Sequence, residues 1–382
     1  MKKRRADDMS LKDIFCQNRA ITFLQRAYAA DRTAQAYIFA GAEGIGRFKT
    51  AGQWARLLLC ETPNVDTSRQ EKFADSCGQC KSCRLFDAGS HPDFHHVYKE
   101  LREFTRDGKG KGPPVDMPID VIREFVIEKV AIRPTFSTRS VFVIGEAEKL
   151  NASSQNSLLK VLEEPPAHCC LILLCTRLDK LLATTRSRCQ TVRFGPIDEE
   201  RIIETLTAKE CQKDRAQYFA RLADGSLGLA CTLAQLEGAG ADLYAIKTSI
   251  VKAMSVYRLP EALQLAGSLC KAAKSISTSL AEIEAATSKT DINRRAGALV
   301  ISIVASVFRD VMMSHVSPPR PLVNSDQKQH IDKLAGRMCV ERASEAVADC
   351  YRMVNWIESN VNEKLIFEQL LLSIARSDRI PA

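Results

Sequence analysis

The stretch Ala36–Gly46, which reads Ala-Tyr-Ile-Phe-Ala-Gly-Ala-Glu-Gly-Ile-Gly, indicates the fold of the first half of the chain. Five consecutive, mostly apolar residues are typical of a strand that is buried on both faces, as in a parallel sheet. The glycines that follow predict a flexible loop. A helix is expected over Thr50–Cys60, because Trp54 and Leu58 share one face with other apolar residues. The sequence therefore predicts a strand, a glycine loop and a helix in direct succession.

Strands and helices continue to alternate beyond this unit. The predicted strands lie within 91–98, 141–144 and 170–175, and the predicted helices lie within 10–35, 119–130 and 153–163. Alternation of this kind predicts an α/β domain whose parallel sheet is covered by helices on both faces. No strand-like run follows Pro196, and the remaining residues read as helices separated by short breaks. We therefore expect an α/β domain followed by an all-helical portion.

Composition is that of an ordinary soluble globular protein. The 382 residues are 45% hydrophobic and 26% charged, and the formal charge is +8, a weak indication of an anionic partner. The most apolar run, Ala296–Phe308, is shorter than the roughly 20 residues that a membrane span needs, so we expect a buried helix there. The charged segment Met1–Asp8 does not resemble a secretion signal. These features predict a cytoplasmic protein with reduced thiols.

The glycine loop has the shape of a phosphate-binding loop without its chemistry. A working loop reads G-x-x-x-x-G-K-[ST], in which the lysine neutralises the phosphates and the hydroxyl holds Mg²⁺. Gly41, Gly44 and Gly46 are present. The next two positions hold Arg47 and Phe48, and a lysine and a threonine follow two residues too late. Because one helical residue is about 100° of rotation, this slip turns both side chains away from the phosphates.

A second loss lies after the strand predicted at 141–144. In nucleotide-hydrolysing proteins this strand ends in Asp-Glu, where the aspartate belongs to the Mg²⁺ shell and the glutamate activates water. This chain has Gly145 and Glu146 instead, so only the glutamate remains. Two losses in one site predict an inactive nucleotide pocket.

Four of the 14 cysteines predict a structural zinc site. They follow the spacing C-x16-C-x2-C-x2-C and are Cys60, Cys77, Cys80 and Cys83. Four thiolates complete a tetrahedral zinc shell and leave no position for a catalytic water. The long first gap makes Cys60 the least certain ligand. Three histidines are alternative fourth ligands: His91, His95 and His96. Unligated thiols in a loop are the competing interpretation.

Several strings resemble the clamp-loader branch of the AAA+ ATPases. They are Gln35–Phe39, His91–Asp93, Asn156–Pro166, Leu182–Cys189 and Asn360–Leu371, and Thr176 stands where that branch has its first sensor. The resemblance implies a RecA-like AAA+ domain over 1–196 with a zinc-binding insertion at 60–83. It further implies a small helical lid over 197–242 and an all-α collar over 243–382 that mediates oligomerisation.

Departures from the motor pattern resemble the non-hydrolysing stator of bacterial clamp loaders. Besides the changes at Arg47, Phe48 and Gly145, the lid segment Gly225–Gly228 lacks the arginine of the motor subunits. The resemblance implies that the chain is no enzyme on its own and does not hydrolyse ATP. It also implies that Arg188, within Ser-Arg-Cys, reaches the ATP site of a neighbouring subunit as an arginine finger. The competing interpretation is a surface arginine paired with a carboxylate.

The resemblance also implies partners: other loader subunits of the delta and gamma/tau types, the sliding clamp and primed DNA, with no membrane. Two alternatives remain at this point. One is an ATP-hydrolysing motor subunit with a displaced loop, against which Gly145 is the strongest objection. The other is a zinc-ribbon DNA-binding protein.

Weaker candidates complete the sequence predictions. Lys109 and Lys111, in the Gly- and Lys-rich loop 105–118, either meet DNA phosphates or are solvated, and the same choice applies to Lys160. His168 lies next to Cys169, but no carboxylate is placed to orient it, so a catalytic dyad is not expected.

Overall fold

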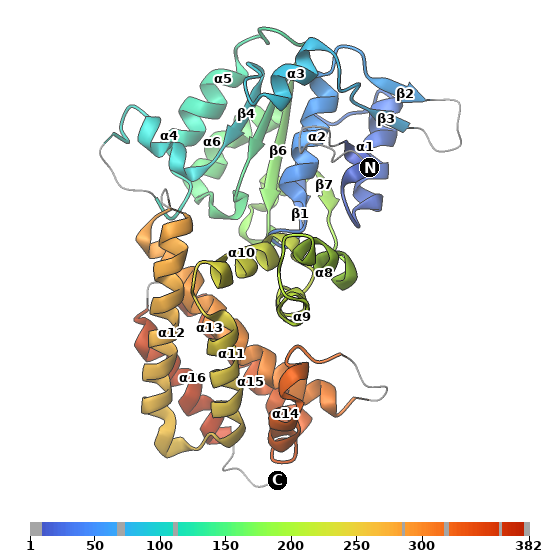
Figure 1. The fold of residues 1–382 in the computed structure, drawn as a ribbon. Helices are drawn as coiled ribbons and strands as arrows, with labels where there is room; N and C mark the ends of the chain where they lie inside the picture. Colours follow the sequence, from blue (N-terminus) through green and yellow to red (C-terminus); the bar gives the residue numbers. More distant parts are fainter. Residues whose placement is uncertain are drawn as a thin grey trace. The chain divides into compact units, whose positions relative to one another are not determined.

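The structure is a computed structural model, and it divides the chain into two compact units. It describes residues 10–66, 73–109, 114–284, 287–316, 321–358 and 361–377. Unit 1 comprises Met1–Arg201 together with Gly225–Gly228, and unit 2 comprises Ile202–Asp224 together with Leu229–Ala382. Figure 1 shows the sheet of unit 1 and the helices of unit 2.

Unit 1 is built on a five-stranded parallel sheet. Its strands are β1 (Ala36–Ala40), β4 (Phe94–Val97), β5 (Ser140–Ile144), β6 (Cys169–Cys175) and β7 (Gln190–Arg193), in the spatial order β4-β5-β6-β1-β7. β1, β5 and β6 are buried along their whole length, as their apolar sequences predict. In the register, Ala40 pairs with Cys175, so the glycine loop emerges beside the end of β6.

Helices cover both faces of this sheet. They are α1 (Asn18–Ala29), α2 (Arg47–Leu59), α3 (Lys81–Asp87), α4 (Ile119–Ile122), a π-helical turn (Arg123–Ile127), α5 (Glu128–Val130), α6 (Ala152–Glu163) and α7 (Ala183–Ser187). Tyr37 and Phe39 pack with Trp54 of α2 on one face. Ile38 packs with Leu158 of α6 on the other. This arrangement confirms the predicted RecA-like AAA+ fold.

Three local features differ from the sequence predictions. α2 begins at Arg47 and not at Thr50. β7 was not predicted, because its sequence Gln-Thr-Val-Arg is short and mostly polar, as an edge strand can be. Residues 61–90, which show no clear periodicity, contain the antiparallel hairpin of β2 (Asn64–Asp66) and β3 (Phe73–Asp75) as well as α3.

Unit 2 contains helices and no strand among its described residues. They are α8 (Glu199–Thr207, which begins in unit 1), α9 (Lys213–Leu222), α10 (Leu227–Gly238, which also begins in unit 1), α11 (Leu243–Val256), α12 (Ala262–Ile283), α13 (Lys289–Ser314), α14 (Lys328–Ala335), α15 (Val340–Glu358) and α16 (Glu363–Ser377). Short 3₁₀ turns occur in both units: Leu11–Asp13, Lys99–Phe104, Ala147–Lys149, Leu178–Lys180, Leu259–Glu261 and Ser325–Gln327. The separation of a lid at 197–242 from a collar at 243–382 stays a prediction.

The apolar helix predicted around Ala296–Phe308 is α13. By length and composition α13 is apolar enough to cross a membrane, but 61% of its most apolar window is buried inside the protein. Val300, Val304 and Phe308 are fully enclosed. α13 therefore has the burial of a core helix around which α12 and α15 pack.

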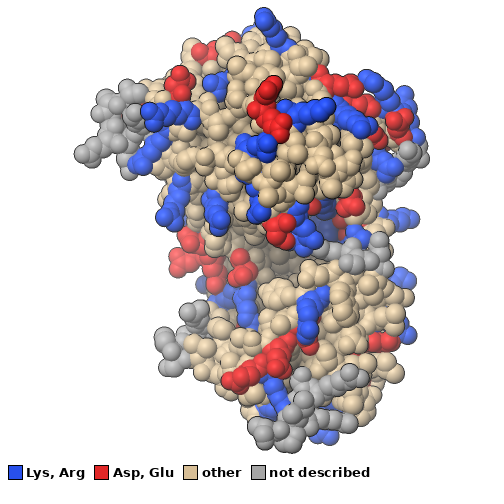
Figure 2. All heavy atoms as spheres, turned by 180° about the vertical axis from the view of Figure 1, so that it is seen from behind, with Lys and Arg blue, Asp and Glu red and all other residues tan. Residues whose placement is uncertain are grey.

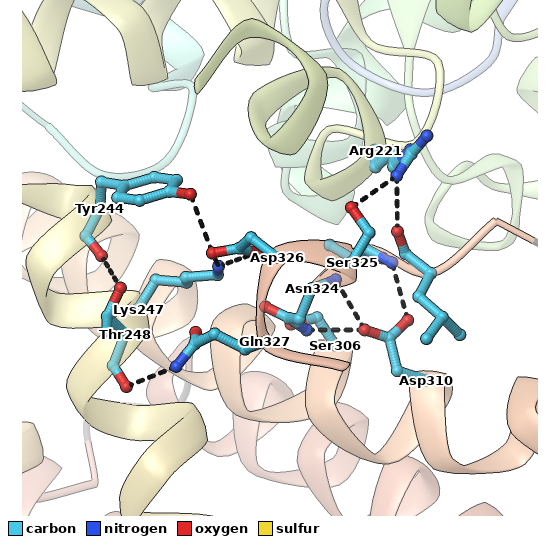
Figure 3. A network of polar contacts seen from close by, with 12 residues as sticks. Arg221, Tyr244, Lys247, Thr248, Ser306, Asp310, Asn324, Ser325, Asp326 and Gln327 are labelled. Atoms are coloured by element: carbon cyan, nitrogen blue, oxygen red, sulfur yellow. Dashed lines mark hydrogen bonds and ion pairs between the residues drawn. The ribbon is translucent and has the colours of Figure 1, made fainter. Parts of the chain in front are cut away.

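A network of polar contacts joins helices of unit 2 to the segment before α14 (Figure 3). The side chain of Lys247 in α11 is fully buried, and its Nζ lies 2.5 Å from both carboxylate oxygens of Asp326. The Tyr244 hydroxyl donates to the same carboxylate at 2.8 Å. The Lys247 ammonium also lies over the rings of Tyr218 and Tyr244, 4.9 and 4.7 Å from their centroids, a favourable placement for a cation. Residues of α9 and α11 thus meet at one buried ammonium group.

Side chains of α13 and α9 also form hydrogen bonds with the segment before α14. Asp310 of α13 accepts hydrogen bonds from the backbone N–H groups of Val323 and Asn324 at 2.8 and 2.7 Å. Arg221 of α9 donates to the carbonyl of Leu322 at 2.8 Å. Because these contacts come from helices far apart in sequence, the segment fixes α9, α11 and α13 to one another.

Candidate functional site

The glycine loop follows β1 and is packed closely by the segment Gly225–Gly228. Gly44 and Gly46 have positive φ angles of 73° and 101°, which favour glycine. The N–H of Gly228 donates to the carbonyl of Gly44 at 2.9 Å, and the Ser226 hydroxyl donates to that of Glu43 at 2.7 Å. The structure therefore brings together the predicted loop and the Gly-Ser-Leu-Gly segment.

Arg47 and Phe48 are the first two residues of α2, and the first side chain is buried while the second is half exposed. Arg47 is buried, and its Nε donates to the Ala42 carbonyl at 3.1 Å within the loop. Burial lowers the pKa of the Arg47 guanidinium, while the carboxylates of Glu148 and Glu43 oppose that shift. The Phe48 side chain is half exposed, and its ring lies 4.6 Å from the ring of His96. A phenyl ring offers no ligand to Mg²⁺.

The hydroxyl of Thr50 is also unavailable to a phosphate or a metal ion. Thr50 is fully buried one turn into α2, and its Oγ1 donates to the carbonyl of Gly46 at 2.9 Å. Lys49 is exposed on the helix surface. The two-residue slip inferred from the sequence therefore leaves the threonine bonded inside its own helix.

Glu146, which the sequence predicts to be the remnant of an Asp-Glu pair, is held between two ammonium groups. It follows β5 in a left-handed conformation with φ of 47°. Its carboxylate lies 3.4 Å from the Nζ of Lys99 and 2.5 Å from that of Lys149. Lys99 is almost fully buried, so this pair is shielded from solvent on one side. The carboxylate is thus engaged by two ammonium groups of its own unit.

Thr176 is bound by a carboxylate that the sequence analysis did not single out. The Thr176 hydroxyl donates to Glu148 Oε1 at 2.7 Å, and its N–H donates to Oε2 at 3.1 Å. Glu148 is also among the charges that act on Arg47. Glu148 stands two residues after Glu146, and this proximity was the only indication in the sequence that it belongs to the site. Glu148 thus connects the end of β6 with the charge environment of the glycine loop.

Arg188 follows α7 at the surface of unit 1. Its Nη2 lies 2.8 Å from Glu163 Oε1, at the end of α6, and its Nη1 donates to the Thr184 carbonyl at 3.0 Å. The side chains of Arg188 and Glu163 are 34% and 49% exposed. Pairing with a carboxylate is the geometry of the competing interpretation, while the exposure suits a group that reaches another subunit. The arginine finger therefore stays a prediction.

The four predicted cysteines meet at one point in unit 1. All four Sγ atoms lie within 4.8 Å of one another. Cys60 lies 3.5 Å from Cys77 and 3.9 Å from Cys80, and Cys77 lies 4.0 Å from Cys83. A tetrahedral shell with Zn–S bonds of about 2.3 Å separates its sulfurs by about 3.8 Å. The donor set and its spacing therefore fit zinc.

Hydrogen bonds to sulfur favour the thiolate form of Cys77, whereas burial raises the pKa of Cys60 to about 11. The N–H of Cys80 and the hydroxyl of Thr62 both donate to Cys77 Sγ at 3.3 Å, and the N–H of Cys83 donates to Cys80 Sγ at 3.4 Å. Burial opposes ionisation of Cys77, but the bonds from Thr62, Gln79 and Cys80 outweigh it and lower the pKa of that thiol to about 6. Cys77 is therefore poised as a thiolate near neutral pH.

His91 is engaged in contacts of its own. Its Nδ1 accepts from the N–H of Asp93 at 3.1 Å, and its Nε2 lies 3.0 Å from the Ser82 hydroxyl. The Ser82 hydroxyl in turn donates to the carbonyl of Leu59 at 2.6 Å. Since Nδ1 accepts, the proton resides on Nε2, and neither nitrogen is left for a metal. This histidine instead ties α3 to the end of α2.

The other two histidines also lie outside the cysteine cluster. His95 stacks on Phe142, with ring centroids 4.5 Å apart, and His96 lies against Phe48 and Tyr98. Among the described residues, the group that can hold a metal ion consists of the four cysteines alone. The structure thus favours Cys60 as the fourth ligand.

The weaker candidates are placed as follows. Lys109 and Lys160 are exposed, and Lys111 lies outside the described residues, as does Asn360 of the last string. His168 Nε2 and Cys169 Sγ both lie near the carbonyl of Val130, at 3.3 and 3.5 Å. Both groups therefore approach the same backbone carbonyl. On the face shown in Figure 2, basic and acidic side chains are interspersed, so the described residues of that face form no continuous basic patch.

Comparison with known proteins relates both parts of the chain to one family. The family model for "DNA polymerase III, delta subunit" matches residues 16–198, and the model for "DNA polymerase III, delta subunit, C terminal" matches residues 261–376. Together the two matches span most of the chain.

Curated relatives include two kinds of subunit. The delta-prime subunit of DNA polymerase III from Escherichia coli is 32% identical over 56% of this chain and 58% of its own length. The tau subunit from Bacillus subtilis is 29% identical over 58% of this chain and 36% of its own. The chain therefore spans less than two thirds of each of these relatives.

The solved structures that align with this chain are distant from it. A gamma subunit-related protein of DNA polymerase III from Thermotoga maritima aligns over 93% of this chain and 99% of its own, with 14% identity and a TM-score of 0.38. The family assignment rests on the sequence matches. The chain belongs to the DNA polymerase III delta subunit family and is similar to its delta-prime members.

Proposed function

We propose that this chain is the stator of a DNA polymerase III clamp loader, a delta-prime-type subunit that does not hydrolyse ATP. One combination of features carries the proposal. Arg47, Phe48 and Gly145 replace the residues that hold phosphate and Mg²⁺ in motor subunits. Arg188, which would serve a neighbouring subunit, is retained at the surface. A stator would lack the ligands for hydrolysis at its own site and keep an arginine for the ATP site of a neighbouring subunit.

Absence of hydrolysis follows from the chemistry of three positions. Phosphoryl transfer needs a metal ion that bridges the phosphates and a base or water-positioning residue. Phe48 and Gly145 provide no metal ligand, and Glu146 is paired with Lys99 and Lys149. The chain is therefore no enzyme by itself, and it acts as part of the DNA polymerase III holoenzyme.

Arg188 supplies the chain's contribution to catalysis in the proposed assembly. A guanidinium presented in trans stabilises charge on the transferring phosphoryl group, an effect of about 10³-fold or more in related systems. The partial exposure of Arg188 supports this role, because a buried arginine would not reach a neighbour.

Zinc has a structural role in this proposal. Cys60, Cys77, Cys80 and Cys83 would hold one Zn²⁺ ion with four thiolates, and a closed tetrahedral shell contributes folding free energy and no catalysis. The ion would fix the hairpin of β2 and β3 and helix α3 against α2.

Partners follow from the proposed assembly. They are delta and gamma/tau subunits, the sliding clamp and primed DNA, and the place of action is the cytoplasm, at the replisome. The similarity to delta-prime subunits supports this set of partners.

A motor subunit of the gamma/tau type is the second candidate. Its support is the match to tau subunits, which are 29–30% identical to this chain over a similar length. The substitution at Gly145 and the packing of Phe48 against His96 oppose it. ATP turnover by the isolated chain would establish the motor and refute the stator.

The main test is a clamp loader reconstituted with the Arg188→Ala variant. We expect the DNA-stimulated ATPase activity to fall by about 10-fold or more, together with clamp loading. Arg186→Ala is the matched control, because Arg186 is another exposed arginine of the same segment. Unchanged ATPase activity and clamp loading in a correctly assembled Arg188→Ala complex would refute the finger.

A further inference from the structure

Glu163 and Arg188 meet across two separate elements of unit 1. Glu163 is the last residue of α6, and Arg188 follows the end of α7. Their side chains approach to 2.8 Å between Oε1 and Nη2. A second contact, from Nη1 to the carbonyl of Thr184 at 3.0 Å, holds the other terminal nitrogen.

These two contacts leave the guanidinium with donors to spare. An arginine carries five N–H groups in a planar fork. One contact to each terminal nitrogen fixes the plane of the fork, and the remaining N–H groups stay available at a surface where the side chain is 34% exposed. Both anchors belong to the same compact unit, so they orient the arginine before any partner arrives.

Orientation of this kind matters because a free arginine side chain is disordered. Ordering it costs rotamer entropy. When two anchors already limit its rotamers, less of that cost falls on the step in which the guanidinium meets a phosphate. An exposed ion pair is itself weak. Glu163 therefore orients Arg188 without withholding it from a more strongly charged anion.

We propose that Glu163 is a positioning residue for Arg188, which it presents to the phosphate groups of a nucleotide bound by a neighbouring subunit. This inference rests on the proposed function of Arg188. Glu163 acts only through Arg188 and does not contact the nucleotide. The Thr184 carbonyl completes the support from the other side.

The test uses clamp loaders reconstituted with five versions of the full chain: wild type, Glu163→Gln, Glu163→Asp, Arg188→Ala and the double variant Glu163→Gln/Arg188→Ala. Glu164→Gln is the matched control, because Glu164 is the adjacent exposed glutamate. Gel filtration establishes that each complex assembles. The kcat of the DNA-stimulated ATPase and its KM for ATP are then measured for each.

We expect Glu163→Gln to lower kcat by about three- to ten-fold while KM changes by less than about two-fold, because misorientation weakens contacts made in the transition state. Glu163→Asp keeps the charge and recovers part of the loss. In the Arg188→Ala background, Glu163→Gln has no further effect, since the group that it positions is gone. Glu164→Gln retains wild-type kinetics.

Several outcomes would overturn the inference. An unchanged or higher kcat in Glu163→Gln, with a strong loss in Arg188→Ala, would remove Glu163 as a positioning residue and leave the finger intact. An equal loss from Glu163→Gln in both backgrounds would assign its effect to another part of the assembly. Wild-type activity in Arg188→Ala would refute the proposed function itself. If Glu163→Gln does not assemble, Glu163→Asp carries the same comparison.

Discussion

Lys247 and Asp326 form a charge pair in which the lysine side chain is fully buried and its ammonium lies 2.5 Å from both carboxylate oxygens. Taking a lysine out of water is unfavourable, and burial lowers the pKa of Lys247 even though Asp326 opposes that shift. The pair is therefore costly to break from one side.

Asp326→Asn should destabilise unit 2 by about 2–4 kcal/mol, because it leaves the buried ammonium without a full negative charge. Lys247→Met, which removes the buried charge and keeps much of the side-chain volume, should cost clearly less. Urea unfolding followed by circular dichroism measures both effects. Asp332→Asn, at an exposed position of α14, is the control. Equal losses in the two test variants would contradict this account of the pair.

The same carboxylate should give stability a dependence on acid. Burial raises the pKa of Asp326, but the hydrogen bonds from Lys247 and Tyr244 outweigh it and bring the pKa below its usual value. A depressed carboxyl pKa contributes stability above the unfolded value of about 4, and this contribution is lost as the pH falls through the folded pKa. The difference in unfolding free energy between wild type and Asp326→Asn should therefore shrink below about pH 4. Urea titrations between pH 3 and pH 7 test this, and a constant difference would argue against it.

Zinc binding should depend on the four clustered cysteines and not on the other cysteines of the chain. We expect one equivalent of zinc in the wild-type chain and its loss in Cys80→Ser, because three thiolates hold the ion less well than four. Elemental analysis of the purified protein gives the stoichiometry. Cys231→Ser lies outside the cluster and should keep the metal.

His91→Ala provides a complementary test of the ligand set. The imidazole is bonded to Asp93 and Ser82 and not to a cysteine, so its removal should leave zinc bound while it destabilises unit 1 by about 1–3 kcal/mol. Loss of zinc in His91→Ala at full stability would instead make this histidine a ligand.

Steric contact between the glycine loop and Gly225–Gly228 should be sensitive to a single methyl group. A Cβ on Gly228 would come within 2.6 Å of the Gly44 Cα, a backbone atom that cannot move aside easily. We expect Gly228→Ala to destabilise unit 1 by about 1–3 kcal/mol. Gly52→Ala is the control, since a Cβ there meets nothing within 4 Å inside helix α2. That variant should gain about 0.5–1 kcal/mol from helix propensity, and a matching effect at Gly228 would refute the close contact.

Repair of the nucleotide site should restore binding more readily than turnover. In the triple variant Arg47→Lys/Phe48→Thr/Gly145→Asp the groups that bind phosphate and Mg²⁺ return. Glu146 nevertheless stays between Lys99 and Lys149. We expect tighter binding of ATP with Mg²⁺ by calorimetry and hydrolysis that stays near the blank. Turnover at the rate of a motor subunit would mean that the lysines do not restrain Glu146.

Much of the fold was predictable because it depends on local pattern. The buried strands β1, β5 and β6 are continuous apolar runs, and their burial on both faces leaves such sequences few alternatives. β7 escaped prediction because an edge strand of four mostly polar residues has no such pattern and is defined by pairing with β1.

The candidate site was predictable where a motif placed its residues and not where contacts join distant segments. The cysteine spacing identified a cluster that the structure brings together. Glu148 on Thr176 and Glu163 on Arg188 depend on how β6, α6 and α7 lie beside one another, and no spacing rule gives that. The buried charge of Lys247 was missed for the same reason.

Contact between the rings of Phe48 and His96 ties the start of α2 to β4. A single mutation that returns a hydroxyl at residue 48 gives up this contact, yet it gains no metal ion while residue 145 remains glycine. A single mutation of Gly145 to a metal ligand likewise gains no metal ion while Phe48 remains. Reversal therefore requires simultaneous changes, none of which is favoured alone. Under the proposed stator function, we therefore expect the site to stay unable to use ATP when either position is changed alone.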